Sequence, residues 1–351
     1  MCIRDSTATV SRVLNNPGYK CSSEELRERI WKIARELNYM PNEAARNLKK
    51  GITNTSQKVW YLDVLMTRTG NLETDPFFSE LLRVIESEIH RQGCILMHIF
   101  HQPLFSNDRK CRTENIDKVI AQMEPDGEIR SDGLIIIGKC NDNVLKKLSA
   151  KYRSIVSVNR NSTNYLVDEV ICDGKRIAAM AVEYLIGLGH RKIGYVGDCH
   201  NESRYKGYQD TLFQYGIDMD ISFVIEAEHT EAEGYAVMER LIQRGDAPTA
   251  IYCANDMIAI GMLKCLNKYK NRYYVPSIIS SDDIEEAQYT RPMLTTVCLP
   301  KEEMGKFALY LLIDRLSGGH KGIVRTELEG KLMIRESCTL VENANRMEYY
   351  I

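Results

Sequence analysis

The stretch IAAMAVEYLIGLGHRKIGYVG, residues 177–197, contains the pattern that decides the fold. Ile177, Ala181, Leu185 and Leu188 recur at the three- to four-residue spacing of one helix face. A glycine, a common helix stop, follows Leu188, and the apolar run IGYVG begins four residues later. Such a short apolar run is typical of a strand that is buried on both faces, as in a parallel sheet.

The same alternation of strand and helix extends in both directions along the chain. Another helix face recurs at Phe78, Leu81, Ile85 and Ile89. Because strands linked by crossover helices run parallel, we predict an α/β fold of doubly wound parallel sheets with helices on both faces. The predicted strands, all after residue 58, are VWYLDVLM, CILMHIF, LIII, SIVSV, VIC, IGYVG, FVIEA, AIYCA and SIISS.

A separate small unit is expected before residue 58, since 351 residues exceed what one hydrophobic core usually sustains. Residues 6–14 form one short helical candidate. After a break at residues 15–18, residues 22–25 have the spacing of a capping box, and a second amphipathic helix follows. We interpret residues 41–58 as a short helix, with Pro41 in its first turn, and a polar linker.

The charge of the chain is unevenly divided between these two parts. Residues 1–58 hold eleven Lys and Arg against six Asp and Glu, a net charge of +5. The whole chain has a net charge of −2, so the remainder carries −7. A small basic unit beside an acidic body is typical of a protein in which one module contacts nucleic-acid phosphates.

Several classes of protein find no support in the sequence. No stretch approaches the roughly 18 apolar residues of a membrane helix, and the N-terminus lacks a secretion signal. The eleven cysteines occur singly, which indicates reduced thiols in a cytoplasmic protein rather than disulfides or a zinc site. His98 and His101 have metal-ligand spacing but no third ligand, so we expect neither a metal nor a cofactor.

Polar residues collect just after the predicted strands, where ligands bind in parallel sheets. Asp, Asn and Arg together offer acceptors and bidentate donors for sugar hydroxyls, and a neighbouring Phe could cover an apolar sugar face. The alternative is that Asp and Asn cap the helices that follow. The residues concerned are Asp75 before Phe77 and Phe78, Asn159, Arg160, Asp173, Arg204, Asn255, Asp256, Asp282 and Asp283.

An enzyme is not expected. The chain contains no G-x-S-x-G motif, no P-loop and no G-x-G-x-x-G motif. Asp282 and Asp283, followed by Glu285 and Glu286, resemble paired catalytic acids, but a solvated helix start explains the two glutamates better.

Two sets of motifs resemble the lactose-repressor and galactose-repressor family of bacterial transcription regulators. Near the N-terminus they are STATVSRVLNNP, residues 6–17, and LNYMPNEAARNL, residues 37–48. In the body they are DPFF from Asp75, LGHRKIGYVG from Leu188, CAND from Cys253 and PMLTTV from Pro292. The resemblance covers nearly the whole chain.

The resemblance implies a helix-turn-helix head that reads operator DNA at residues 1–40, followed by a hinge helix and linker at 41–57. It assigns base contacts in the major groove to Thr7, Ala8 and Arg12. Phosphate contacts fall on Thr9, Ser11 and Asn15, and Leu48 would wedge into the minor groove. Only Met1 to Asp5 precede the recognition element, so we expect the first helix of the motif to be missing, which puts operator binding by this chain in question.

The body is similar to two-lobed periplasmic sugar-binding proteins. The expected lobes are 58–160 with 293–318, and 161–292 with 319–338, before a tail at 339–351. Ligand binding between them would act allosterically on the DNA-binding heads of a homodimer, possibly a tetramer, on a near-palindromic operator. The effector residues implied are Asp75, Phe77, Asn159, Arg160, Asp173, Arg204, Asn255 and Asp282.

Two departures from the family pattern concern the effector. Ser280-Ser281 stands where Gly-Phe is frequent, which changes the floor of the site. Asn159-Arg160 replaces a common Asp-Arg and removes a negative charge, which favours a neutral, hydroxyl-rich mono- or oligosaccharide. The main alternative to a sugar-responsive repressor is a cytoplasmic sugar-binding sensor that does not bind DNA.

Overall fold

The computed structural model describes residues 59–68, 75–106, 110–123, 130–200, 202–269 and 274–343, and scattered positions between 9 and 33. The chain divides into two compact units, Met1–Val59 and Trp60–Ile351. Six positions with predicted DNA contacts lie outside the described residues, namely Thr7, Ala8, Ser11, Arg12, Asn15 and Leu48.

The described positions of the first unit are helical where the sequence predicts helices. Thr9, Val10 and Val13 belong to one helix, and Val13 is buried. In the second helix the backbone N–H of Leu26 donates to Ser23 Oγ at 3.2 Å, so Ser23 caps it. Ile30, one turn further on, is also buried.

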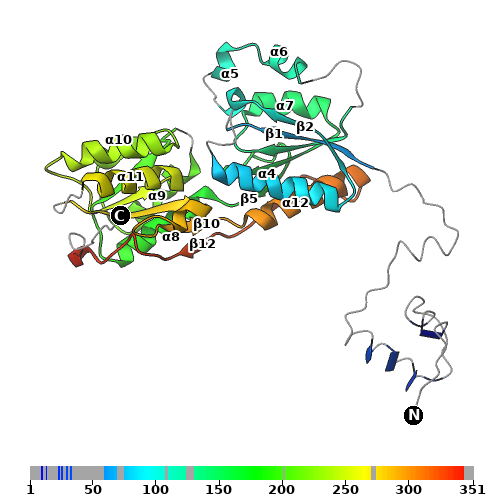
Figure 1. The fold of residues 1–351 in the computed structure, drawn as a ribbon. Helices are drawn as coiled ribbons and strands as arrows, with labels where there is room; N and C mark the ends of the chain where they lie inside the picture. Colours follow the sequence, from blue (N-terminus) through cyan, green and yellow to red (C-terminus); the bar gives the residue numbers. More distant parts are fainter. Residues whose placement is uncertain are drawn as a thin grey trace. The chain divides into compact units, whose positions relative to one another are not determined.

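The second unit contains two six-stranded sheets, which define a first and a second lobe (Figure 1). The first sheet has the order β11-β5-β4-β3-β1-β2, and all its strand pairs are parallel. Its strands are β1 (Tyr61–Met66), β2 (Ile95–His101), β3 (Gly133–Ile137), β4 (Ser154–Asn159), β5 (Asp168–Ile171) and β11 (Arg325–Glu327).

Alternate residues of these strands pack on opposite faces of the first sheet, because side chains of a strand point up and down in turn. Val64 and Ile135 join a core cluster with Phe78 of α4, whereas Leu65 and Ile136 join a separate cluster on the other face. Buried strands therefore read as continuous apolar runs. Helices α4 (Pro76–Arg91) and α12 (Lys301–Ser317) cover one face, and α5 (Lys110–Thr113), α6 (Ile116–Ala121) and α7 (Asp142–Lys151) lie over the other (Figure 1).

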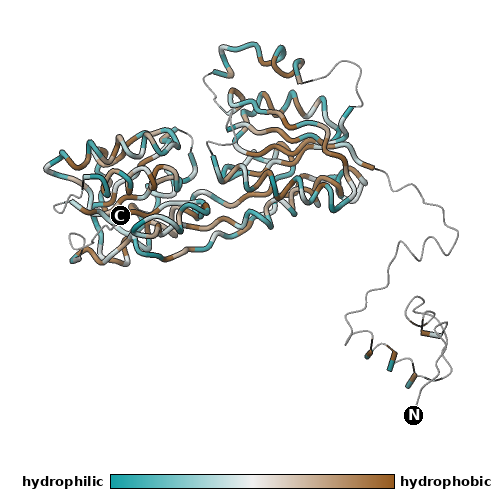
Figure 2. Tube along the Cα trace, viewed as in Figure 1, coloured by the Kyte–Doolittle hydropathy of each residue, from teal (hydrophilic) through white to brown (hydrophobic). Residues whose placement is uncertain are grey.

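The second sheet has the order β12-β10-β9-β8-β6-β7, and only the pair of β10 and β12 is antiparallel. Its apolar strands lie beneath helices with polar outer faces (Figure 2). The strands are β6 (Ile193–Gly197), β7 (Val224–Glu226), β8 (Ala250–Cys253), β9 (Ser277–Asp282), β10 (Thr295–Cys298) and β12 (Lys331–Met333). The helices are α8 (Gly174–Gly187), α9 (Ser203–Gln214), α10 (Glu231–Ile242) and α11 (Asp256–Tyr269).

The lobe boundaries expected from the sequence assign three strands, β5, β10 and β11, to the wrong lobe. β5 pairs with β4 and β11 pairs with β5, so both lie in the first sheet, although 161–292 and 319–338 were assigned to the second lobe. β10 pairs with β9 in the second sheet, although 293–318 was assigned to the first lobe. The chain therefore crosses between the lobes after β5, after β10 and after β11.

The nine cysteines that the structure describes are free thiols, and each is buried or partly buried. Within the described residues no helix has the length and apolar character needed to cross a bilayer.

Candidate functional site

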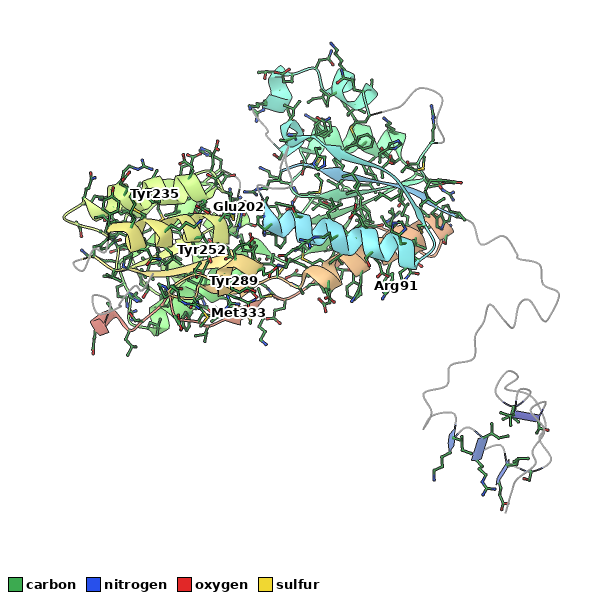
Figure 3. The ribbon with its side chains drawn as sticks, viewed as in Figure 1. Arg91, Glu202, Tyr235, Tyr252, Tyr289 and Met333 are labelled. Carbon is green, nitrogen blue, oxygen red and sulfur yellow. The ribbon has the colours of Figure 1, made fainter. Side chains whose placement is uncertain are left out.

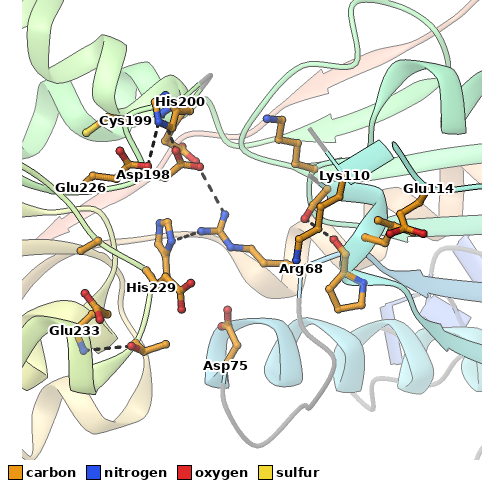
Figure 4. Close-up of a pocket in the computed structure, with 18 of the residues that line it drawn as sticks. Arg68, Asp75, Lys110, Glu114, Asp198, Cys199, His200, Glu226, His229 and Glu233 are labelled. Atoms are coloured by element: carbon orange, nitrogen blue, oxygen red, sulfur yellow. Dashed lines mark hydrogen bonds and ion pairs between the residues drawn. The ribbon is translucent and has the colours of Figure 1, made fainter. Parts of the chain in front are cut away.

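A cavity of about 1450 Å³ lies between the two lobes (Figure 4). It opens at the carboxyl ends of β1, β6 and β7, the edge at which doubly wound sheets bind ligands. The first lobe contributes Arg68, Asp75, Pro103, Leu104, Ser106, Lys110, Arg112, Glu114 and Lys139 to its wall, and the second lobe contributes Asp198, Cys199, His200, Glu202, Glu226, Ala227, Glu228, His229, Thr230 and Glu233.

A buried ion pair anchors the second-lobe side of the cavity. Arg204 at the start of α9 has no exposed side-chain surface, and its Nε donates to Glu202 Oε1 at 2.9 Å. Its Nη1 donates to the carbonyl of Ala254. Burial alone would raise the pKa of Glu202, but the attraction and hydrogen bond of Arg204 outweigh it and hold that pKa at about 2. The pair is therefore ionised and rigid. Glu202 is labelled in Figure 3.

His229 lies between two guanidinium groups that come from different lobes. Arg68 Nη2 is 2.5 Å from its Nδ1, and Arg204 Nη2 is 3.1 Å from its Nε2. Burial, followed by the charges of Arg68, Arg204 and Arg160, lowers the pKa of His229 well below its usual value. The imidazole is therefore neutral.

A second ion pair links the lobes at the inner end of the cleft. Arg160 Nη2 bonds to Asp282 Oδ1, and both side chains are almost completely buried. The guanidinium lies over the Phe77 ring at 4.2 Å from its centroid. Asp282 has a φ of 126°, a conformation that L-residues rarely adopt, so the turn after β9 is held by its contacts.

Asp75 caps a helix and also lines the cavity. Its carboxylate accepts from the backbone N–H of Phe78 at 3.4 Å, which caps α4, and the same side chain lines the cavity. Burial, followed by the nearby charge of Asp282, raises the pKa of Asp75 to about 6.

Three further predicted residues have local partners. Asn255 Oδ1 accepts from Ile258 N at 3.1 Å, Asp173 accepts from Lys175 N at 2.9 Å, and Asn159 Nδ2 donates to the carbonyl of Asn161 at 3.1 Å. Asn255 also donates to the carbonyl of His229 at 3.3 Å. Asn159, Arg160 and Asp173 line a second cavity of about 690 Å³, which shares Arg112 and Lys139 with the first.

The predicted residues thus fall into three groups. Asp75 lines the first cavity and Asn159, Arg160 and Asp173 line the second. Arg204, Asn255 and Asp282 lie behind these surfaces, in contact with residues that line them. The Phe77 ring is buried beneath Arg160, so the face predicted to cover a sugar is occupied in this conformation.

The sequence analysis missed Arg68, Glu202 and His229. Arg68 follows the apolar run of β1 by one residue, and His229 comes shortly after β7. The same rule of polar residues after strands, applied to every strand, would have found both. Glu202 lies between the end of β6 and the predicted Arg204, so the same rule would have found it as well.

Within the described residues no cluster of three or more His, Cys, Asp or Glu side chains could hold a metal ion. His98 instead contacts Asp63 at 3.0 Å.

A two-lobed body with a cleft between parallel sheets, preceded by a separate small helical unit, defines a class of ligand-responsive regulators. Residues 6–42 match the bacterial regulatory proteins of the lacI family, and residues 182–338 match the periplasmic binding protein-like domain. The transcriptional repressor MelR of Bacillus subtilis is 30% identical over 95% of this chain and 94% of its own length. The chain belongs to the lacI family.

Solved structures of similar fold agree with this assignment. The regulator CelR in complex with cellobiose gives a TM-score of 0.67 at 22% identity, over 94% of this chain and 95% of its own. The lac repressor dimer bound to operator and the anti-inducer ONPF gives 0.65 at 22% identity, over 95% of each chain. The protein is thus a DNA-binding transcription regulator with a small-molecule effector domain, and not an enzyme.

Proposed function

We propose that this protein is a cytoplasmic repressor that binds a near-palindromic operator as a homodimer, or as a tetramer, and that a sugar in the interlobe cleft controls its affinity for DNA. The observation that supports this most directly is the cavity of about 1450 Å³ with polar walls from both lobes. A ligand that contacts both walls stabilises one lobe arrangement over the other.

The relatives support the two partners. CelR was solved with cellobiose and the lac repressor with operator DNA, and MelR is a repressor by name. We assign DNA contacts to Thr7, Ala8, Thr9, Ser11, Arg12, Asn15 and Leu48 in the head and hinge. We assign effector contacts to Asp75, Asn159, Arg160 and Asp173. Arg204, Asn255 and Asp282 position the wall of the site. Phe77 can contact an effector only after Arg160 has moved away from its ring.

Operator binding tests the proposal. The purified chain is titrated with labelled near-palindromic DNA from upstream of its gene, at several salt concentrations. Because phosphate contacts release counterions, specific affinity should fall steeply with salt. Arg12→Ala should weaken binding by about tenfold or more, the value of a lost base contact.

Arg244→Ala provides the matched control, since Arg244 is exposed in the second lobe and bonds only to Ser222 among the described residues. It should leave the affinity for operator unchanged. Equal binding to operator and to scrambled DNA would contradict the proposal and favour a sugar sensor that does not read DNA.

A further inference from the structure

His229 has one more hydrogen-bond donor beside it than it can accommodate. A neutral imidazole accepts at one ring nitrogen and carries a proton on the other, whereas guanidinium groups only donate. Arg68 lies at Nδ1 and Arg204 lies at Nε2. One of these contacts therefore brings two N–H groups face to face.

Arg204 is the guanidinium that cannot move. Arg204 is fixed by Glu202 and by the carbonyl of Ala254, and its side chain has no exposed surface. It cannot turn away from His229 without breaking those bonds. The tautomer that satisfies this fixed guanidinium has Nε2 as the acceptor, and in that tautomer Nδ1 carries the proton and faces Arg68.

Among the described residues, no carboxylate lies within direct hydrogen-bond distance of Arg68. Its nearest carboxylate oxygen among the described residues is Glu202 Oε2, at 4.0 Å. By contrast, Arg160 and Arg204 each bond directly to a carboxylate. Arg68 is 21% exposed and lies at the cavity wall (Figure 4), so it can move to meet a ligand.

The two cavities near Arg68 differ in the charge of the side chains that line them. The second cavity shares Arg112 and Lys139 with the first. Seven Lys and Arg side chains and two Asp side chains line it. Four Lys and Arg against seven Asp and Glu line the first cavity, and two of these acidic residues, Glu226 and Glu228, are exposed in the second-lobe wall. Exposed carboxylates are screened by salt, and they accept hydrogen bonds from hydroxyl groups.

We infer that the effector is an anionic, polyhydroxylated molecule, a sugar acid or a sugar phosphate, whose carboxylate or phosphate oxygen binds between Arg68 and His229 Nδ1–H. An oxygen at that place accepts from both donors and removes the contact between the two N–H groups. The acidic second-lobe wall then accepts from the hydroxyl groups of the ligand. This inference rests on the proposed function, because it assumes an effector in the cleft.

Calorimetric titration of the full chain with matched sugars tests the inference. Each pair differs only in the charged group: glucose with glucuronate, glucose with glucose 6-phosphate, and cellobiose with cellobiouronate, in which C6 of the non-reducing ring is a carboxylate. We expect one charged member to bind at least about tenfold tighter than its neutral parent, as charge-assisted hydrogen bonds to arginine require. The carboxylate and phosphate pairs show which anion the site takes.

Arg68→Gln should remove most of that preference and leave the affinity for the neutral parent nearly unchanged. His229→Phe keeps a ring at the position but deletes the Nδ1 proton, so it should weaken the charged ligand in the same way. Arg240→Gln is the matched control, because Arg240 is exposed on α10 and bonds only to the carbonyl of Ala236 among the described residues. Equal thermal midpoints for the variants and the parent show that each is folded.

A neutral sugar that binds as tightly as its charged partner, or an Arg68→Gln variant that weakens both alike, overturns the inference. The proposed function survives that result if the neutral sugar alters operator binding. If no sugar of either kind binds or alters operator binding, the inference and the sugar-controlled repressor both fail.

Discussion

At the scale of single residues, Asp256 shows how the second lobe holds a carboxyl group almost out of contact with water. It accepts from Ser280 Oγ and Thr296 Oγ1, each at 2.6 Å, and from the backbone N–H of Ile284 at 2.8 Å. Burial, followed by the charge of Asp282, raises the pKa of Asp256 to about 7. Ser280, a departure from the family pattern, thus has a structural partner.

The raised pKa of Asp256 makes the stability of the protein depend on pH. In the unfolded chain an aspartate has a pKa of about 3.9. Between that pH and about 7, Asp256 is protonated in the folded state and ionised in the unfolded state. Stability should therefore fall across that window. Asp256→Asn, which mimics the protonated acid, should lack this decline.

Urea unfolding at several pH values between about 5 and 8, a range around the raised pKa, measures the difference between the two proteins. The free energy of unfolding of the parent should decrease relative to Asp256→Asn as pH rises. A difference that stays constant would show that Asp256 does not titrate in this range.

The pair of Glu202 and Arg204 should behave as one unit. Arg204→Met leaves the buried carboxylate of Glu202 without its partner and should lower the free energy of unfolding by about 3–5 kcal/mol. Adding Glu202→Gln to that variant should recover part of the loss, because it removes the uncompensated charge. Denaturant unfolding of the two single variants and the double variant tests this, and simple additivity would contradict it.

Part of the candidate site could be predicted from single residues, because polar side chains after buried strands are visible in the sequence. Asp75 and Asp173 line cavities, and they also cap helices. Their contacts could not be predicted, because the partners are distant in the chain. Arg160 and Asp282 are 122 residues apart, and only the folded lobes bring them together.

At the scale of elements, two glycines set how closely α10 and α11 pack. A Cβ on Gly234 would lie 2.0 Å from the carbonyl oxygen of Ile258, and one on Gly261 would lie 2.0 Å from that of Glu231. The obstacle in each case is backbone, which cannot turn aside. These helices therefore cross at a distance that only glycine permits.

Gly234→Ala should lower the free energy of unfolding by about 1–3 kcal/mol, the usual cost of overpacking. Gly187→Ala is the matched control, since its Cβ meets nothing within 4 Å and the residue is exposed at the end of α8. It should be neutral or stabilise the protein by up to about 1 kcal/mol. Equal losses in urea unfolding would show that packing is not the cause.

A cluster of charged residues fixes the loop between α12 and β11. Arg315 bonds to both carboxylate oxygens of Asp168, and the backbone N–H of Val324 donates to Asp168 at 2.7 Å. His320 contacts Asp314 through Nδ1 at 2.6 Å and Asp168 through Nε2 at 2.9 Å. Both ring nitrogens face carboxylates. The hydrogen bond to Asp314, followed by the one to Asp168, raises the pKa of His320.

His320 should therefore stabilise the protein at low rather than high pH. Because the pKa of His320 is raised in the folded state, the protonated ring stabilises the fold. This contribution to the free energy of unfolding is complete below the usual histidine pKa of about 6.5 and is lost as pH rises through the pKa of the folded state. The difference in unfolding free energy between the parent and His320→Gln should shrink from acidic to alkaline pH. A difference that grows with pH would refute the role assigned to His320.

The strands β1 to β9 follow from the apolar pattern, whereas β10, β11 and β12 do not. Each predicted apolar run overlaps one of the strands β1 to β9. β11 has the sequence RTE and β12 has KLM, which are too short and too polar to show a strand period. Because β11 was not predicted, the return of the chain to the first sheet was not predicted either. The lobe boundary expected near residue 319 was therefore wrong.

At the scale of the whole molecule, both sheets depend on the last part of the chain. β11 completes the first sheet beside β5, and β12 completes the second beside β10. Beyond β12, Ile278 N donates to the carbonyl of Ser337 at 2.8 Å, and His190 Nε2 contacts that of Thr339 at 3.0 Å. The second lobe is therefore closed by residues 331–341.

A chain that ends after residue 320 should lose cooperative unfolding, because it exposes one edge of each sheet. A chain that ends after residue 343 keeps both strands and should unfold like the parent. Circular dichroism during urea unfolding separates the two outcomes. A cooperative transition in the shorter chain, at the denaturant concentration of the parent, would show that β11 and β12 are dispensable.

This late closure has a consequence for synthesis on the ribosome. Both sheets remain incomplete until residues 325–333 have emerged, so most of the nascent chain waits with unpaired edges beside β5 and β10. At about 5–20 residues per second, translation of the preceding body lasts for many seconds. During that time the open edges can pair with other nascent chains, so newly made protein of this kind should depend on chaperones more than a protein whose lobes are each encoded by one continuous segment.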